Sequence, residues 1–512
     1  MKVYLMFEDR DFDPDQPLPV NEHDLSQDLE LDTLLHAMAL GDKFLYYIGR
    51  SAVLAGLNEP DEIRYRQDVL RDCLKNPEVV RAIYRMPIEA DKSKRSHWLG
   101  IFTRTPSGVL SSSLDLMRLF VGFLRQLKSI ADEHGGKFES AGFRAFFATL
   151  QRELSDDYFE VVEAQLKQLS YRDGVLISAE LGRGNEGHNY VLRLPNERNR
   201  GWLKEVFSKR PPVYSFRVHP RDDAGSRALS EIKDRGINLA ANALAQASDH
   251  IDSYLKMLQI ELAFYIGCMN LHEQLDRLDA PLAFPVPERM TERAHTFRGL
   301  YDPCLALTIG KNIVGNDVNA QGQSLVVITG ANQGGKSTFL RSIGLAQLMM
   351  QAGMFVPAAG FRANLSAGVF THFKRKEDAS MTSGKLDEEL GRMSDIVDSL
   401  SPGALMLFNE SFAATNEREG SEIAGQITRA LVEKQVKVFF VTHMYEFART
   451  CYERGTPDTL FLRAERKPDG TRTFKLLPGE PLSTSHGKDV YRAVFDEQAN
   501  PVEEAPVTSE QA

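Results

Sequence analysis

The stretch "SLVVITGANQGGKSTFLRSIGLAQLMM", residues 324–350, decides the fold of the second half of the chain. Its apolar run at residues 325–328 predicts a buried strand, and an amphipathic helix is expected after the loop. The loop itself, from Gly330 to Ser337, fits the pattern G-x-x-x-x-G-K-S. In this pattern backbone N–H groups surround phosphate oxygens, the lysine reaches the β- and γ-phosphates, and the serine offers an oxygen to Mg²⁺. We therefore predict a phosphate-binding loop formed by Gly330, Ala331, Asn332, Gln333, Gly334, Gly335, Lys336, Ser337 and Thr338.

Two further apolar strands end in polar residues that suit the same site. The strand at residues 404–408 is followed by Asn409 and Glu410, and the strand in "VKVFFVTHMYEFA" ends near His443. In open α/β sheets ligands bind at the carboxyl ends of the strands, so these side chains should meet the phosphate loop. We predict Glu410 and His443 as catalytic residues, with Ser337 and Asn409 as metal ligands. A histidine at such a position is by itself more often structural, and only its companions favour a role in hydrolysis.

Asn409 stands where hydrolases of this type place a magnesium-binding aspartate. Asparagine keeps an oxygen acceptor of similar shape but loses the negative charge. Two interpretations are open, a dead site and a slow one. Because Glu410, Lys336 and Ser337 remain, and because a triphosphate supplies most of the metal's ligands, we favour slow hydrolysis.

The composition sets broad limits on the whole chain. It has 512 residues, of which 42% are hydrophobic and 26% charged, with a formal net charge of −10. The length suggests about two to four domains, and the acidity argues against bulk electrostatic coating of nucleic acid without excluding a local basic face. Four cysteines lie far apart, which indicates neither a zinc site nor a disulfide framework. Neither a signal sequence nor a membrane span is expected, so we predict a cytoplasmic protein.

The pattern along the chain predicts four segments. Residues 1–30 form an N-terminal segment, and residues 31–285 a helical region with a hairpin insertion near residues 171–221. The hairpin "GVLISAELGRGNEGHNYVLRL", residues 174–194, overlaps a basic stretch from Arg193 to Arg221 that holds eight basic residues and two acidic ones. Helical spacing continues through residues 251–269 until the prolines of "APLAFPVPER" end it. An α/β domain at residues 286–495 and a disordered acidic tail at residues 496–512 complete the prediction.

The segment at residues 308–447 resembles the ATPase domain of the MutS family of DNA mismatch-repair proteins. "TGANQGGKSTFLRSIGLAQLMMQAGMFVPA" is similar to the family's phosphate loop and following helix, and "FFVTHMYEFA" to its histidine switch. "DASMTSGKLDEELGRMSDIVDSL" occupies the place of the signature loop, with Ser383, Gly384 and Glu389 at matching positions. The resemblance implies an ABC-type P-loop ATPase domain that uses ATP and Mg²⁺, pairs with a second copy as a homodimer, and places Ser383 at nucleotide. It also implies a helical core and lever with a clamp-like insertion, and DNA as the partner.

The sequence departs from the family pattern at three further places besides Asn409. No mismatch-reading domain with a Phe-x-Glu motif fits into the first thirty residues. The base-stacking aromatic residue is replaced by Ile313, which predicts an apolar adenine contact. After His443 only "GKDVYRAVF", residues 487–495, is available as a dimerisation element.

Two functional hypotheses follow. The first is an ATP-dependent DNA-binding protein that binds mismatched or structured DNA and couples ATP binding and slow hydrolysis to clamp closure, in mismatch repair or a related process. Its candidate DNA contacts are Arg193, Arg198, Arg200 and Lys204. The alternative is a nucleotide-bound scaffold or regulatory protein without DNA contact. A GTPase is disfavoured because no guanine-reading N-K-x-D follows the phosphate loop.

Overall fold

A computed structural model describes residues 2–98, 105–171, 174–194, 214–375, 384–467 and 471–482. The chain divides into two compact units. Unit 1 comprises Met1–Tyr4, Asn76–Glu139 and Phe143–Leu262, and unit 2 comprises Leu5–Lys75, Ser140–Gly142 and Ala263–Ala512. The candidate dimerisation element at residues 487–495 and the predicted tail at residues 496–512 lie outside the described residues.

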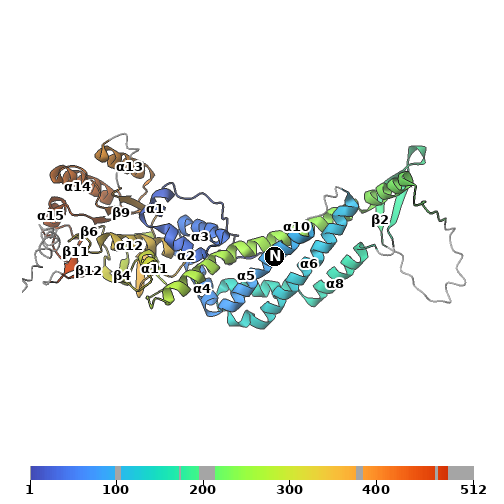
Figure 1. Ribbon diagram of the computed structural model, residues 1–512, viewed down its shortest axis with the longest axis horizontal. Coiled ribbons are helices and arrows are strands. Elements are labelled where there is room, and N and C mark those ends of the chain that lie inside the picture. The colour runs from blue at the N-terminus through green and yellow to red at the C-terminus, as the bar shows by residue number, and fades with distance from the viewer. Residues whose placement is uncertain are drawn as a thin grey trace, which may run out of the picture. The chain divides into compact units, whose positions relative to one another are not determined.

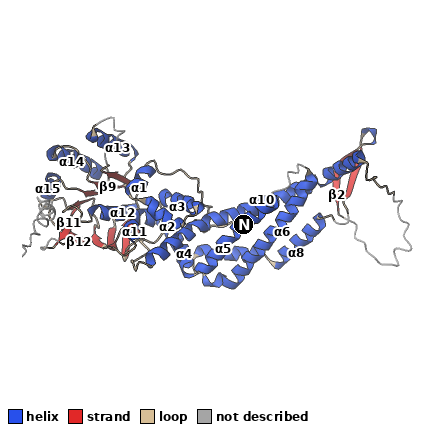
Figure 2. Ribbon diagram, viewed as in Figure 1, coloured by secondary structure: helices blue, strands red, loops and turns tan. Residues whose placement is uncertain are grey.

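Unit 1 is helical with one β-hairpin (Figures 1 and 2). Its helices are α5 (Pro77–Trp98), α6 (Pro106–His134), α7 (Ala141–Glu153), α8 (Asp156–Leu169) and most of α10 (Asp223–Asp276). The Lys94 ammonium donates to the Asp252 carboxylate at 2.9 Å and so joins α5 to α10. The predicted helix through residues 251–269 is confirmed as part of α10, whose residues from 263 onward belong to unit 2.

Helix α6 is the one described helix long and apolar enough, by length and composition, to cross a membrane, and 44% of its most apolar window is buried. Leu114, Phe120 and Leu124 are among its buried residues, and α6 packs against α5 and α8. A core helix shows the same pattern of length and composition.

The predicted hairpin is confirmed. Strand β1 (Leu176–Leu181) pairs antiparallel with β2 (Gly187–Arg193), and the glycine-containing turn between them includes Gly184 at φ +74°. The Ile177 side chain packs closely on Gly236 of α10, where a Cβ atom would lie 2.4 Å from it. The hairpin therefore contacts the N-terminal part of α10, near Gly236, within unit 1.

Unit 2 contains helices, two sheets and the strands predicted around the phosphate loop. Its helices are α1 (Glu22–Asp28), α2 (Leu31–Ala39), α3 (Lys43–Ala55), α4 (Pro60–Lys75), α11 (Pro303–Ile309), α12 (Lys336–Gln351), α13 (Lys385–Ser399), α14 (Glu417–Glu433) and α15 (Tyr445–Arg454). Its strands are β3 (Val286–Glu288), β4 (His295–Leu300), β5 (Asn316–Asn319), β6 (Leu325–Thr329), β7 (Gly360–Asn364), β8 (Val369–Phe373), β9 (Leu405–Asn409), β10 (Lys437–Val441), β11 (Thr459–Arg466) and β12 (Arg472–Pro478). A helical region together with α/β sheets was the predicted fold class, and this is confirmed.

The larger sheet brings the predicted strand ends together. Its order is β12-β11-β6-β10-β9-β8, and all neighbours are parallel except β11 and β12. Val441 of β10 pairs with Ile328 of β6 on one side and with Asn409 of β9 on the other. The carboxyl ends of these three strands therefore lie side by side, as the sequence predicted. The smaller sheet, in the order β3-β7-β4-β5, was not predicted.

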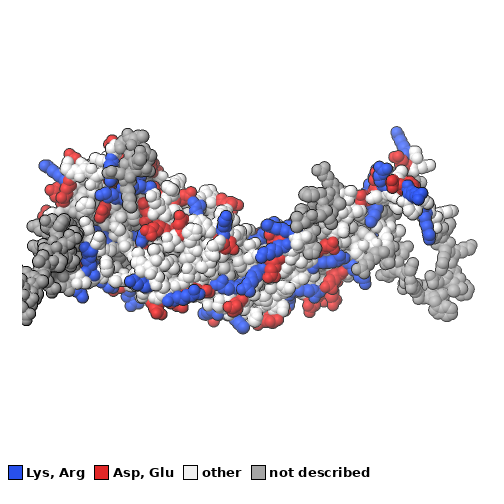
Figure 3. Space-filling view, viewed as in Figure 1, with Lys and Arg blue, Asp and Glu red and all other residues white. Residues whose placement is uncertain are grey.

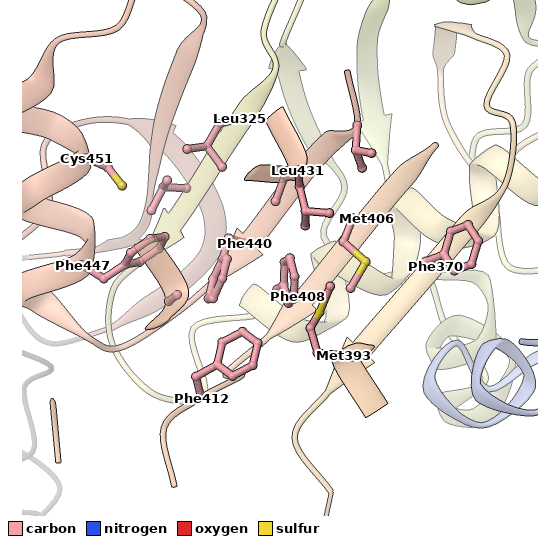
Figure 4. Close-up of a cluster of buried hydrophobic side chains, with 14 of the residues drawn as sticks. Leu325, Phe370, Met393, Met406, Phe408, Phe412, Leu431, Phe440, Phe447 and Cys451 are labelled. Carbon is pink, nitrogen blue, oxygen red and sulfur yellow. The ribbon is translucent and has the colours of Figure 1, made fainter. Parts of the chain in front are cut away.

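Aromatic residues form the core on one face of the larger sheet (Figure 4). Phe408 of β9 stacks on Phe440 of β10 with ring centroids 4.8 Å apart, and Phe440 contacts Phe447 of α15. Strands buried on both faces are apolar along their length, which explains why β6, β9 and β10 were recognisable in the sequence. Helix α12 contacts β8, β9 and β10 as well as β4 of the smaller sheet.

The N-terminal residues belong to the same unit as the sheets, although the sequence grouped residues 31–75 with the helical region. Helix α1 covers the edge strand β8, where the Asn21 amide donates to the Val369 carbonyl at 2.8 Å. Arg375, just beyond β8, forms an ion pair with Asp24 of α1. Covering an edge strand satisfies polar groups that would otherwise be open to pairing with another chain. The domain boundaries given by the sequence remain a prediction.

Candidate nucleotide-binding site

The loop between β6 and α12 has the backbone conformation that phosphate binding requires. Gly330 has φ +120° and Gly335 has φ +86°, values that side chains other than glycine rarely adopt. A Cβ atom on Gly330 would lie 2.9 Å from both the Cβ atom and the backbone nitrogen of Ala464 on β11, so the loop also packs too closely for any larger residue. Gly335 precedes the first turn of α12 and provides no side-chain cap, so the N–H groups of that turn are available to an anion.

Lys336 lies across this loop. Its ammonium donates to the main-chain carbonyls of Gly330 and Ala331, each at 2.9 Å, and the residue is buried. Burial lowers the pKa of Lys336, and the nearby Glu410 carboxylate opposes that shift. Two hydrogen bonds thus hold the Lys336 ammonium beside the amides of the loop. A bound phosphate group could replace the two carbonyls as the acceptor of these hydrogen bonds.

Ser337 and Asn409 form the predicted metal pair. The Ser337 hydroxyl donates to the Asn409 side-chain oxygen at 2.9 Å, across the gap between α12 and β9. Each of the two side chains would offer a neutral oxygen atom as a metal ligand. Mg²⁺ prefers oxygen ligands and keeps several waters. The donor set therefore fits Mg²⁺ in kind, with one carboxylate charge fewer than an aspartate would give.

Glu410 and His443 lie on neighbouring strand ends. His443 Nδ1 is 3.9 Å from Glu410 Oε1, and both side chains are partly exposed. The Glu410 N–H donates to the Val441 carbonyl at 2.9 Å, which fixes the start of the loop after β9 to β10. Glu410 itself has φ +55°, a left-handed conformation that costs about 1 kcal/mol or more for a residue with a side chain.

A buried polar cluster beneath Glu410 was not predicted. The Ser411 hydroxyl lies 2.5 Å from the His372 carbonyl oxygen and 2.8 Å from His372 Nδ1, and its single proton is available to either acceptor. Nε2 of the same ring is 2.9 Å from the main-chain oxygen of Glu389, and the Glu389 carboxylate accepts the Phe412 N–H at 2.6 Å. Burial lowers the pKa of His372 to about 4, with Arg392 adding to the effect. The residues come from β8, α13 and the loop after β9, and no local pattern in the sequence links them.

Strand β12 forms a second contact with the phosphate loop that the sequence did not indicate. The Arg472 guanidinium donates to the Gln333 side-chain oxygen at 2.6 Å. Phe474 is exposed and lies against Gly335, where a Cβ atom would be 3.5 Å from the Phe474 Cβ atom. Arg472 and Gln333 are about 140 residues apart in the sequence, so the sequence of the loop alone could not predict this contact.

Ile313 lies outside this group of polar residues. It is partly buried against a small apolar cluster of Ala280, Tyr301 and Ala306. Close to Ile313 in the chain, the Gly315 carbonyl accepts a hydrogen bond from Lys475, and the Asn316 side chain donates to the Phe474 carbonyl of β12. Ser383, the other predicted nucleotide contact, lies outside the described residues.

The predicted DNA contacts are described only at Arg193. This residue ends β2, is exposed, and donates from Nε to the Ser178 hydroxyl at 2.8 Å. Arg217 and Arg221 lie in the described part of the basic stretch, whereas Arg198, Arg200 and Lys204 lie outside the part of the chain that the structure describes. On the face visible in Figure 3, basic and acidic side chains are interspersed, in keeping with 61 basic and 71 acidic residues in the sequence.

Two family models match successive parts of the chain. Residues 58–278 match the MutS2 N-terminal domain, and residues 326–498 match MutS domain V. The chain belongs to the MutS family. The second match covers the phosphate loop, Asn409, Glu410 and His443, so the candidate site lies in the part of the chain similar to MutS domain V.

Individual members of the MutS family are similar over different lengths. A DNA mismatch repair protein MutS of Thermus aquaticus is 33% identical over 318 residues, 59% of this chain and 35% of that protein. An endonuclease MutS2 of Geobacillus thermodenitrificans is 26% identical over 451 residues, 81% of this chain and 56% of that protein. A DNA mismatch repair protein MutS of Prochlorococcus marinus strain MIT 9301 is 30% identical over 169 residues, 32% of this chain and 18% of that protein. The chain thus matches at most about half the length of these three relatives.

Proposed function

We propose that the chain is an ATPase that binds DNA and couples ATP binding and slow hydrolysis to a change in its grip on DNA. The observation that carries the ATPase assignment is the 2.9 Å bond between Ser337 and Asn409, because it joins the phosphate loop to the strand end that carries Glu410. Membership of the MutS family supports DNA as the partner, and mismatch repair or a related process as its setting.

In the proposed site each residue has a separate task. The amides of the loop and the Lys336 ammonium bind the β- and γ-phosphates. Ser337 and Asn409 would hold Mg²⁺, which offsets the negative charge of the phosphates when it is bound. Glu410 accepts a proton from the attacking water, and His443, 3.9 Å from it, orients the water or the γ-phosphate.

Asn409 sets the expected rate. An amide oxygen holds the metal's shell more weakly than a carboxylate, and a loss of about 2–3 kcal/mol would slow hydrolysis by roughly thirty- to a hundredfold. Glu410 and Lys336 are retained beside Asn409 and Ser337, which supports a slow site rather than an inactive one. ATP binding would then persist for long periods between hydrolysis events.

The proposed DNA contacts lie on the hairpin and the basic stretch after it. Arg193 is exposed at the end of β2, where its guanidinium could contact a DNA phosphate, a contact that carries no sequence information. Helix α10 contributes residues to both units, which supports mechanical coupling between DNA contact and the nucleotide site. A second copy of the chain is proposed to pair through the ATPase domains, with Ser383 contributing to nucleotide contact.

The test is ATPase turnover with and without mismatched, branched and perfectly paired DNA, on the unmodified protein and on Glu410→Gln. We expect one DNA structure to change turnover in the unmodified protein, and the variant to lose hydrolysis while it still binds a fluorescent ATP analogue. If DNA neither binds nor changes turnover while ATP still binds, the scaffold alternative replaces the DNA-binding proposal. If the two proteins hydrolyse ATP equally, Glu410 is not the general base.

A further inference from the structure

The segment that carries Glu410 is strained. Glu410 has φ +55° and Phe412 has φ +63°, so two of three consecutive residues with side chains are left-handed. Each such residue costs about 1–3 kcal/mol and persists only where its surroundings hold it in place. Between them, Ser411 is fully buried. The question is which groups impose this conformation on the loop.

The groups that impose it come from β8 and α13. The Phe412 N–H donates to the buried Glu389 carboxylate of α13 at 2.6 Å. The Ser411 hydroxyl contacts both the main-chain carbonyl and Nδ1 of His372 on β8, and the Phe412 ring stacks on the His372 ring with centroids 5.2 Å apart and an interplanar angle of 20°. The Glu389 carboxylate and the His372 ring thus fix the loop at Phe412, while the bond from the Glu410 N–H to the Val441 carbonyl fixes it at the other side of Ser411.

His372 also joins α13 to β8, so His372, Glu389, Ser411 and Phe412 form one connected group of contacts. A carbonyl oxygen only accepts hydrogen bonds, so His372 Nε2, 2.9 Å from the Glu389 carbonyl, must carry a proton and donate. Arg392, one turn after Glu389, donates to the Phe373 carbonyl at 3.0 Å. Residues 389 and 392 of the same helix therefore hold the end of β8, and Glu389 also holds the loop after β9.

We propose that Glu389 and His372 are positioning residues that hold Glu410 in its left-handed conformation and couple its alignment to helix α13. A displacement of α13 withdraws the acceptor from the Phe412 N–H and lets the loop relax toward ordinary backbone angles. Relaxation moves the Glu410 carboxylate away from the phosphate loop. This inference rests on the proposed role of Glu410 in hydrolysis. It adds Glu389 and His372 as the residues that control whether the Glu410 carboxylate is aligned for hydrolysis.

A third element limits how far the loop can move. A Cβ atom on Gly420 of α14 would lie 2.4 Å from the Phe412 carbonyl oxygen, so α14 packs directly on the loop backbone. The Glu389 carboxylate has one oxygen bonded to Phe412, while the other is buried and has no hydrogen-bond partner among the described residues. Glutamine at this position would keep the single acceptor that the loop uses. Alanine would remove it and leave the Phe412 N–H buried and unpaired, which costs about 1–3 kcal/mol.

The experiment compares Glu389→Ala, Glu389→Gln and Gln351→Ala. Gln351 is the matched control, because its buried side-chain oxygen also accepts a main-chain N–H, from Ser366 at 3.1 Å, but before the start of β8 at the opposite end of that strand from His372. We expect Glu389→Ala to lower kcat by about 10- to 100-fold, since a displacement of about 1 Å can have that effect. KM and the affinity for a fluorescent ATP analogue should change less than about twofold, while Glu389→Gln should stay within about threefold of the unmodified kcat. Gln351→Ala should lower Tm but not kcat.

Hydrogen–deuterium exchange of residues 405–416 separates this inference from the proposed function, because it needs no hydrolysis. Glu389→Ala should speed exchange in this segment, whereas Gln351→Ala should not. If the unmodified protein hydrolyses no ATP but the exchange result holds, the proposed function fails and the positioning role stands. Unchanged exchange and unchanged kcat in folded Glu389→Ala would overturn the inference. Equal reduction of kcat in the alanine and glutamine variants would also overturn it, because the glutamine retains the acceptor.

Discussion

The Ser337 hydroxyl donates to the Asn409 side-chain oxygen at 2.9 Å, so the two candidate metal ligands already lie within direct reach of each other. An aspartate at position 409 could make the same contact and would add a negative charge. The substitution therefore changes the electrostatics of the site with little change in its shape.

Asn409→Asp should raise both turnover and Mg²⁺ affinity. The added charge is expected to increase kcat by roughly thirty- to a hundredfold at limiting Mg²⁺. Steady-state ATPase rates across a Mg²⁺ titration measure both quantities. Ser337→Ala should lower Mg²⁺ affinity in either background, which serves as the control. No gain in either quantity would show that position 409 does not limit the enzyme.

Gly330→Ala should abolish nucleotide binding and destabilise unit 2. The new Cβ atom would lie 2.9 Å from the Ala464 backbone nitrogen, and the backbone has φ +120°. Gly322→Ala is the matched control, because Gly322 also has positive φ, at +74°, but no atom of the described structure lies within 4 Å of the added Cβ. The control should cost only about 1 kcal/mol, from the backbone conformation. Thermal unfolding and binding of a fluorescent ATP analogue provide the readouts, and similar behaviour of the two variants would contradict the close packing.

Lys437→Met should stabilise the protein most at neutral and lower pH. Burial lowers the pKa of Lys437 to about 7, with Arg293 adding to the effect, and both residues line a cavity of about 380 Å³. The unfolded lysine titrates near about 10.4, so between the two pKa values the unfolded state binds more protons and the stability of the unmodified protein rises with pH. Below the folded-state pKa both states are charged, and the full penalty of burial applies.

At pH 6 the free energy of unfolding of Lys437→Met should therefore exceed that of the unmodified protein by about 1–3 kcal/mol. This difference should decrease toward pH 10. Denaturant unfolding at pH 6, 8 and 10 measures it. Lys434→Met, at an exposed position three residues earlier, should show no such trend. The difference in unfolding free energy between Lys437→Met and the unmodified protein could instead be the same at every pH. That result would mean that burial does not disfavour the charged form of Lys437.

Alanine at Arg193, Arg198 and Arg200 together should weaken DNA binding and flatten its salt dependence. Removing each phosphate contact should reduce the slope of log K against log salt by about 0.9 for duplex DNA. Fluorescence anisotropy with one duplex at several salt concentrations measures the slope. Alanine at Arg85, Arg144 and Arg152, on other helices of unit 1, controls for the removal of three charges. If the salt slope is the same for the unmodified protein and the variant with alanine at Arg193, Arg198 and Arg200, these residues do not contact DNA phosphates.

The sequence suggested those candidate residues that stand in recognisable local patterns. The glycines and Lys336 of the phosphate loop lie within a few residues of each other, and Asn409, Glu410 and His443 each lie at or just after the end of a strand whose apolar run is visible in the sequence. Parallel pairing then places all of them at one edge, which follows from a general rule for such sheets.

The parts that were missed depend on contacts between distant segments. His372 carries no signal in the sequence, and the resemblance that singled out Glu389 did not indicate its contact with Phe412. The attachment of α1 to β8 relies on polar side chains such as Asn21 and Asp24, which carry no periodic signal. The smaller sheet escaped notice because its strands are short and combine segments between residues 286 and 364.

The contact of Arg472 with Gln333 has a consequence for the order in which the chain acquires its structure during synthesis. Strand β12 supplies one side of the phosphate loop, yet it is translated more than 130 residues after Gly335. Most of unit 1 is a continuous stretch that can form its local helix contacts early, whereas unit 2 must retain residues 5–75 until β12 emerges from the ribosome. A nascent chain that stops before residue 472 would therefore have an unfinished nucleotide site, and nucleotide binding would report the completion of translation through β12.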